Sequence, residues 1–233
     1  MKTLRRILII CPFPRGVAAV QRLKYEQYFN HWRENGFEIT VSSFMDLPMW
    51  KVVYTRGNYT AKILGTLRGC LCRVVDIFRI RRFDLVYVFM WVTPLGTSFF
   101  ERLFRLLSRR LIYDIEDNVI MEKSNNINPF VRLFKSSQKT IFPIKTADHV
   151  ITSSPFLNDY TLGLNRKKAC TYISSTVDTD CFLPVNLYRN DRKVIIGWTG
   201  TFSSKVYIDL LKKVFYELSK RCEFGLRVIG NFQ

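Results

Sequence analysis

The sequence is poor in acidic residues and in histidine. Its 233 residues include 19 Asp and Glu against 36 Lys and Arg, so the formal net charge is +17. Such an excess of positive charge implies an anionic partner, for example a membrane surface, a nucleic acid or a phosphorylated substrate. Because no nucleic-acid-binding motif is recognisable, we do not expect nucleic acid to be the partner. The two histidines, His31 and His149, lie far apart in the chain and suggest no metal site.

The sequence also has no long apolar run and no secretion signal. No run approaches the ~20 residues that span a bilayer. The basic start is followed by Pro12 and Pro14 rather than by a cleavage site of small residues, which predicts a first strand and not a signal peptide. The six cysteines lack the spacing of a zinc or redox motif. We therefore expect a cytoplasmic, globular chain with reduced thiols.

What the sequence does contain is an alternation of strand and helix patterns. Strands are expected at 7–11, 37–44, 85–89, 111–115, 150–152, 169–173 and 194–198. Helices are expected at about 18–35, 59–80, 96–109, 129–147 and 155–162. This alternation predicts an α/β fold in which parallel sheets are covered on both sides by helices. Such sheets bind ligands at the carboxyl ends of their strands.

The strand 194–198 begins a second unit of this kind. It runs into a turn at Gly200, and an amphipathic helix follows. In doubly wound nucleotide-binding folds, backbone N–H groups at this position meet phosphate. Thr201 and Ser203 add hydroxyl donors, and Lys205 can reach a phosphate as a point charge. An ordinary glycine turn is the alternative.

A polar, irregular stretch at 184–192 separates this unit from the rest of the chain. A stretch of this composition is typical of a linker. It divides the chain into an N-terminal domain, 1–185, and the start of a C-terminal domain, 186–233.

Three carboxylates, Asp114, Glu116 and Asp117, follow the expected strand 111–115. Alternation along a strand places Asp114 and Glu116 on one side, with Asp117 just past them. Clustered carboxylates can act as a general base toward a hydroxyl group, accept hydrogen bonds from sugar hydroxyls, or bind a cation. The alternative is a turn or helix start that carries acids without a functional role.

The turn after the first strand is a second candidate for ligand contact. Arg15 brings charge to the end of the strand, and Gly16 lets the backbone approach a ligand closely. Arg22, one turn into the following helix, faces either the same crevice or solvent. An ordinary strand-to-helix turn explains these residues equally well.

Two basic helices, at 62–82 and 97–110, carry apolar residues on one face and arginines on another. The apolar face of the first comprises Leu64, Leu67, Leu71, Val74, Val75 and Phe78. One hypothesis is that the apolar faces pack on the core and the cationic faces are solvated. The other is that these helices dock on an anionic membrane leaflet, where each Lys or Arg near the surface contributes roughly 1 kcal/mol of binding free energy.

Six segments together carry a family resemblance. They are 17–44, 113–117, 150–160, 176–184, 196–201 and 226–230. The most specific is TVDTDCFLP at 176–184, which is close to a Gly-Val-Asp-x-x-x-Phe-x-Pro string, with its spacing to Gly200. The pattern resembles the retaining GT-B glycosyltransferases of the group 1, family 4-like type, which include bacterial mannosyl- and glucosyltransferases.

The resemblance implies two Rossmann-like domains with a cleft between them, the second incomplete at residue 233. It implies transfer of a sugar from a nucleotide-diphosphate sugar to a glycan or lipid-linked acceptor in cell-surface polysaccharide synthesis. No metal or other cofactor is implied. Helices of the first domain often dock on the membrane in this family, so peripheral association with the inner membrane is expected.

Position by position, the resemblance places Arg15, Gly16 and 114–117 on the acceptor side, where Asp117 is the candidate catalytic residue. The donor diphosphate would lie near Gly200, Thr201 and Lys205, and a nucleotide-recognition loop would begin at Gly230. The family's paired glutamates fall beyond residue 233. The alternative hypothesis is therefore a catalytically incomplete fragment or split subunit that binds a membrane or a partner.

Overall fold

The computed structural model describes residues 5–53, 55, 57–116, 138–183, 194–200 and 205–230. The chain divides into two compact units after Phe182. The expected linker 184–192 lies outside the described residues.

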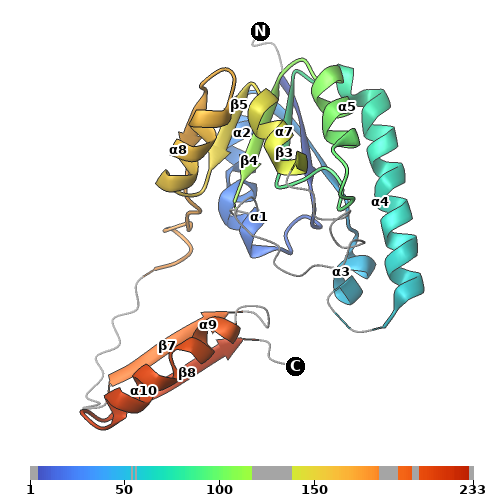
Figure 1. The fold of residues 1–233 in the computed structure, drawn as a ribbon. Helices are drawn as coiled ribbons and strands as arrows, with labels where there is room; N and C mark the ends of the chain where they lie inside the picture. Colours follow the sequence, from blue (N-terminus) through green and yellow to red (C-terminus); the bar gives the residue numbers. More distant parts are fainter. Residues whose placement is uncertain are drawn as a thin grey trace. The chain divides into compact units, whose positions relative to one another are not determined.

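The first unit is built on a sheet of six parallel strands in the order β2-β1-β3-β4-β5-β6 (Figure 1). The strands are β1 (Arg5–Cys11), β2 (Phe37–Ser43), β3 (Leu85–Phe89), β4 (Leu111–Ile115), β5 (His149–Thr152) and β6 (Cys170–Tyr172). The predicted parallel sheet is confirmed. The strand order reverses between β1 and β3, and in open parallel sheets ligands bind outside the carboxyl ends of the strands at such a switch point.

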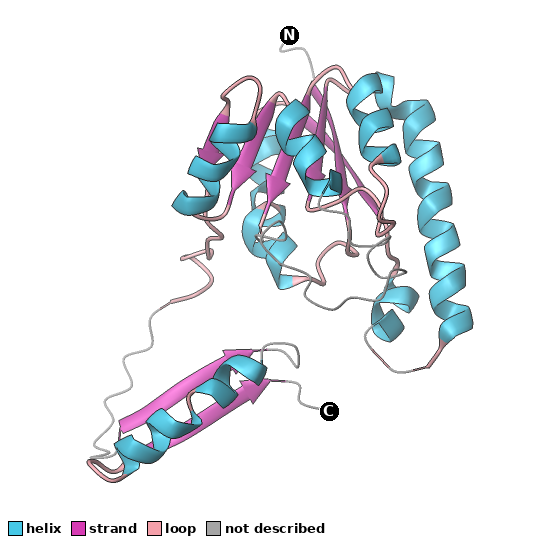
Figure 2. Cartoon of the chain, in the orientation of Figure 1, coloured by secondary structure: helices cyan, strands magenta, loops and turns pink. Residues whose placement is uncertain are grey.

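Helices cover both faces of this sheet (Figure 2). They are α1 (Ala19–Lys24), α2 (Phe29–Glu34), α3 (Leu47–Val53), α4 (Tyr59–Arg79), α5 (Phe99–Leu107), α7 (Gln138–Thr146) and α8 (Pro155–Leu164). The helix expected at 18–35 is instead broken at Tyr25, whose φ of −141° is not helical. The sequence pattern did not predict α3. Within the described ranges, no helix combines the length and apolar character needed to cross a bilayer.

Strand alternation divides the buried apolar strand residues between two cores, one on each face of the sheet. The core beneath α1 and α2 comprises Ile7, Ile9, Cys11, Tyr25, Phe29, Tyr87 and Phe89. The core beneath α5, α7 and α8 includes Leu8, Ile10, Val86, Val88, Phe104, Tyr113, Ile115, Ile144, Val150 and Leu157. Because Tyr113 and Ile115 lie in the second core, Asp114 between them faces α1.

The long helix α4 is oriented opposite to the expectation that its apolar face packs on the core. The exposed side chains are Ile63, Leu64, Leu67, Leu71, Val74, Val75 and Phe78, and Phe78 is 82% exposed. Toward the protein the helix instead presents Gly69, Arg73 and Asp76, which are buried. The prediction of a core-facing apolar stripe on α4 is therefore wrong.

Close packing at two glycines explains this orientation. A Cβ atom on Gly65 would lie 2.7 Å from the sulfur of Met49, and one on Gly69 would lie 2.6 Å from the ring of Phe44. Both contacts are shorter than real Cβ atoms show, so only glycine allows the helix to approach this closely. The face of α4 that contains the two glycines therefore packs closely against Met49 and Phe44.

We expect Gly69→Ala to lower the free energy of unfolding by about 1–3 kcal/mol, because the added methyl group overlaps the buried ring of Phe44. The matched control is Gly163→Ala in α8, where nothing lies within 4 Å of the new Cβ. That change should stabilise the protein by about 0.5–1 kcal/mol through helix propensity. Urea denaturation measures both, and equal effects of the two changes would contradict the packing explanation.

The other basic helix, α5, follows the core-packing hypothesis in part, since Phe99 remains 59% exposed. Phe104 is fully buried, and Phe100 and Leu107 pack against the same core. Its arginines point outward into local contacts: Arg105 pairs with Asp148 at 3.2 Å.

The second unit is a βαβ arrangement. Strands β7 (Val194–Gly200) and β8 (Phe224–Gly230) pair in parallel, with helices α9 (Lys205–Leu210) and α10 (Lys212–Ser219) between them in the chain. The predicted strand followed by a helix is confirmed, although the helix is divided at Leu211. In the strand register Gly200 lies opposite Gly230.

Candidate functional site

A lysine and two carboxylates meet at the carboxyl end of β4. Lys24, at the end of α1, places its Nζ 3.7 Å from Oδ1 of Asp114 and 3.6 Å from Oε2 of Glu116. Lys24 and Asp114 are buried, and the Glu116 side chain is 18% exposed. The expectation that Asp114 and Glu116 share one side of the strand fits this geometry. We call Lys24, Asp114 and Glu116 the carboxylate cluster.

Neighbouring strands and loops hold the carboxylate cluster in place. Tyr87 on β3 donates a hydrogen bond to Oδ2 of Asp114. Lys24 donates to the carbonyl of Ile173, just past β6. Ser175 donates to Oε1 of Glu116 at 3.1 Å. The cluster is therefore fixed by three hydrogen bonds, one from β3 and two from the segment after β6, as a preorganised site requires.

The carboxylate cluster retains unused acceptor capacity. Among the described residues, no group donates a hydrogen bond to Oδ1 of Asp114 or to Oε2 of Glu116. Burial raises the pKa of Asp114 to about 6, although the nearby Lys24 ammonium and the hydrogen bond from Tyr87 lower it. Both oxygens are buried beside the Lys24 ammonium group, and each keeps lone pairs that the described residues leave unused.

The described side chains include no group of three or more His, Cys, Asp and Glu residues placed to hold a metal ion.

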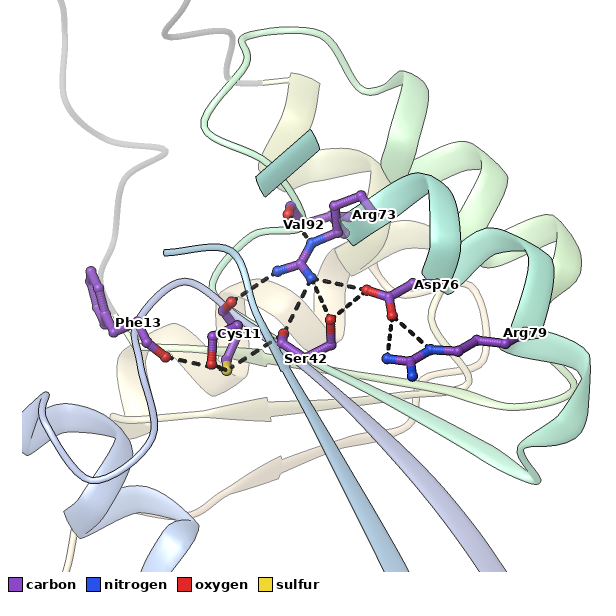
Figure 3. Close-up of polar contacts among 8 residues, drawn as sticks. Cys11, Phe13, Ser42, Arg73, Asp76, Arg79 and Val92 are labelled. Atoms are coloured by element: carbon purple, nitrogen blue, oxygen red, sulfur yellow. Dashed lines mark hydrogen bonds and ion pairs between the residues drawn. The ribbon is translucent and has the colours of Figure 1, made fainter. Parts of the chain in front are cut away.

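A buried arginine joins strand ends on both sides of the switch point (Figure 3). Arg73 donates from Nε to the carbonyl of Val92 at 2.6 Å and from Nη2 to that of Cys11 at 2.9 Å. Its Nη1 donates to the carbonyl of Ser42 at 3.2 Å and pairs with Asp76 at 3.0 Å. Cys11 ends β1, Ser42 lies near the end of β2, and Val92 follows β3. One side chain thus fixes three strand exits relative to one another.

The turn after β1 is held by the buried Gln21 of α1 and by the half-buried Glu26 in the turn that follows it. Gln21 accepts a hydrogen bond from the N–H of Phe13 and donates to its carbonyl, both at 3.1 Å. Glu26 accepts from the N–H of Gly16 at 2.9 Å. Gly16 has a φ of +77°, which a residue with a side chain rarely adopts. The structure thus gives Gly16 a conformational role in this turn.

Of the remaining predicted acceptor-side residues, the structure describes Arg15 and Arg22. The guanidinium of Arg15 lies over the ring of Phe29, 5.2 Å from its centroid. Arg22 is exposed on α1. Asp117 lies outside the described residues.

On the predicted donor side, the structure brings two residues together. Gly200 and Gly230 pair at the carboxyl ends of β7 and β8. Thr201, Ser203 and the side chain of Lys205 lie outside the described residues, although Lys205 begins α9.

Sequence reasoning missed Lys24, Tyr87 and Arg73. Strand alternation could have placed Tyr87 on the same face as Asp114, because β3 and β4 are neighbours. Lys24 and Arg73 gave no such signal, because lysine and arginine on a helix are usually solvent-exposed.

No protein-family model matches the chain, and no curated protein matches its sequence. Among solved structures, sucrose-phosphate synthase from Thermosynechococcus elongatus is similar, with a TM-score of 0.64 and 12% identity over 97% of this chain. This chain spans 62% of the length of that synthase. An α-glucosyltransferase in complex with UDP gives a TM-score of 0.47 and 10% identity, covering 96% of this chain and 68% of that one.

At such low sequence identity, the structural similarity to the synthase shows a shared fold and nothing further. The fold class predicted from the sequence, α/β with parallel sheets of the GT-B type, is confirmed.

Proposed function

We propose that this chain takes part in transferring a sugar from a nucleotide-diphosphate sugar to a hydroxyl group of an acceptor. The observation that carries the proposal is the carboxylate cluster at the carboxyl end of β4. Parallel sheets bind ligands at this edge, and carboxylates suit sugar hydroxyls. The fold shared with a sucrose-phosphate synthase supports the same class of reaction.

Within the carboxylate cluster, Glu116 is the group that an acceptor can reach. Its side chain is 18% exposed, whereas that of Asp114 is fully buried. In this proposal Glu116 accepts a hydrogen bond from the acceptor hydroxyl, and Lys24 holds both carboxylates in position. Asp117, two residues beyond β4, remains the predicted catalytic residue.

The donor belongs to the second unit in this proposal. The paired glycines Gly200 and Gly230 leave the carboxyl ends of β7 and β8 free of side chains, so a diphosphate can approach the backbone. Lys205 would offset the diphosphate charge as the leaving group departs, as in other phosphate-leaving reactions. The proposal also specifies that transfer retains the anomeric configuration and that the acceptor is a glycan or is lipid-linked. It further assigns the chain a role in cell-surface polysaccharide synthesis.

Titration calorimetry with UDP-, GDP- and ADP-sugars tests the donor half of the proposal. We expect one nucleotide class to bind with a Kd of roughly 1 µM to 1 mM, the usual range for enzyme substrates. Absence of binding heat for all three classes, with a folded protein, would exclude an autonomous donor site.

We expect Glu116→Gln to lower the rate of sugar transfer about 100-fold, because a neutral amide is a much weaker hydrogen-bond acceptor for the acceptor hydroxyl than a carboxylate. Donor binding should not change. The matched control is Glu38→Gln, an exposed glutamate near the amino end of β2, at the opposite edge of the sheet. If both variants transfer sugar as fast as the unaltered chain, Glu116 has no role in the reaction.

A second candidate function is that of a module that docks on an anionic membrane. The observation behind this candidate is the exposed apolar face of α4, through which such a module would dock. This candidate predicts no sugar transfer, and lipid binding that weakens as salt rises.

A further inference from the structure

The exposed face of α4 has the spacing of a coiled-coil seam. Its central residues are Leu64, Leu67, Leu71, Val74 and Phe78, which alternate steps of three and four along the helix. All five are at least 40% exposed, and Ile63 and Val75 widen the same face. A strict seven-residue repeat of apolar residues is the pattern by which one helix packs against another. We call these seven residues the α4 seam.

The basic residues of α4 are turned away from the α4 seam by contacts within the chain. Arg68 pairs with Asp46 at 3.4 Å, and Arg79 pairs with Asp76 at 2.7 Å. Arg73 is buried. Lys62, the remaining basic residue of the helix, donates to the carbonyl of Thr55.

This charge distribution favours a protein partner over a lipid surface. An anionic leaflet recruits a helix through cations that flank its apolar face. Within α4 these cations are already paired or hydrogen-bonded in the chain, and the exposed Arg81 and Arg82 lie beyond its C-terminal end rather than along the seam. An uncharged seam with heptad spacing instead fits a second uncharged seam with the same spacing.

We propose that the α4 seam joins two copies of this chain, with α4 of one copy packed against α4 of the other. A self-complementary patch produces a two-fold dimer, the commonest oligomer. Seven large side chains leave an apolar patch well above the few hundred Å² usual on a monomer. Together with its rim it approaches the roughly 800 Å² that each partner contributes to a stable interface.

The two helices run antiparallel in this dimer. Arg81 and Arg82, exposed just after the C-terminal end of α4, have no acidic counterpart on the α4 seam. A parallel pair would bring the two arginine clusters together, whereas an antiparallel pair separates them.

Sedimentation velocity over a concentration series tests the dimer. The unaltered chain should dimerise, and Leu71→Glu in the middle of the α4 seam should weaken dimerisation about 100-fold or more, since both copies lose a buried leucine. Because Leu71 is 66% exposed, this change should leave the fold intact. The control is Phe156→Glu, an equally exposed residue on α8 that should leave dimerisation unchanged.

Spin labels at position 81 test the orientation. They are attached to an Arg81→Cys chain whose half-buried and exposed cysteines are replaced by serine. In the antiparallel dimer the two labels should lie about 30 Å apart, because each is ten residues from the centre of the seam. A distance of roughly 10 Å would indicate a parallel pair and overturn this part of the proposal.

Flotation with vesicles that contain anionic phospholipid tests whether a lipid surface, and not a second copy of the chain, binds the α4 seam. The dimer proposal predicts that the chain stays with the soluble fraction, with or without Leu71→Glu. A monomer at all concentrations, or flotation that Leu71→Glu abolishes and Phe156→Glu does not, would assign the α4 seam to something other than a second copy.

Discussion

Arg73→Met is expected to lower the free energy of unfolding by about 3–5 kcal/mol. The change removes the buried cation that pairs with Asp76, whose charge is then compensated only by the half-exposed Arg79 and the hydroxyl of Ser42. It also leaves the buried carbonyls of Cys11, Ser42 and Val92 without the donors that Arg73 supplies. Urea denaturation monitored by circular dichroism measures the loss.

Two further variants separate the causes of this effect. Arg73→Lys keeps the positive charge but cannot reach three carbonyls from one planar group, so it should fall between the unaltered chain and Arg73→Met. Arg68→Met removes a half-exposed arginine of the same helix and should cost less than about 1 kcal/mol. If Arg73→Met costs no more than Arg68→Met, the three strand exits do not depend on Arg73.

The second large effect is a pH dependence centred on Asp114. Its pKa in the folded chain is about 6, raised from 3.8 mainly by burial. Between these two values the unfolded chain has lost the proton and the folded chain still holds it, so this carboxyl contributes less stability as pH rises. Two pKa units correspond to about 3 kcal/mol.

Asp114→Asn isolates this contribution because asparagine does not titrate. The difference in unfolding free energy between Asp114→Asn and the unaltered chain should shift by about 3 kcal/mol in favour of the variant from pH 4 to pH 7. Asp84→Asn is the control: a backbone hydrogen bond from Arg6 lowers the pKa of the exposed Asp84 below 3.8, so its contribution changes only below about pH 4 and the Asp84→Asn difference should stay nearly constant from pH 4 to pH 7. If the Asp114→Asn difference stays constant across this range, the folded pKa of Asp114 is not raised.

The sheet could be predicted from the sequence because buried parallel strands are continuous apolar runs. The strands 85–89 and 111–115 were predicted with the bounds that the structure gives them. The orientation of α4 could not be predicted in this way. Its leucines have the spacing of a core face, but Gly65 and Gly69 permit an approach that no apolar side chain allows.

The candidate site was predicted only in part, because some of its contacts are local in the sequence and others are not. Alternation along β4 is a local property, so it placed Asp114 and Glu116 together correctly. Lys24 reaches them from a helix 90 residues earlier in the chain, and Ser175 from a segment after β6. Contacts of this kind depend on the tertiary arrangement, which a single sequence does not reveal.

Incubation of the purified chain with labelled nucleotide sugars and a cell-envelope extract as acceptor tests the central proposal most directly. The account predicts that one labelled sugar passes to the extract, and that Glu116→Gln transfers it about 100-fold more slowly while Glu38→Gln does not. Transfer that is unaffected by Glu116→Gln, or no transfer of any labelled sugar by the folded chain, would contradict it.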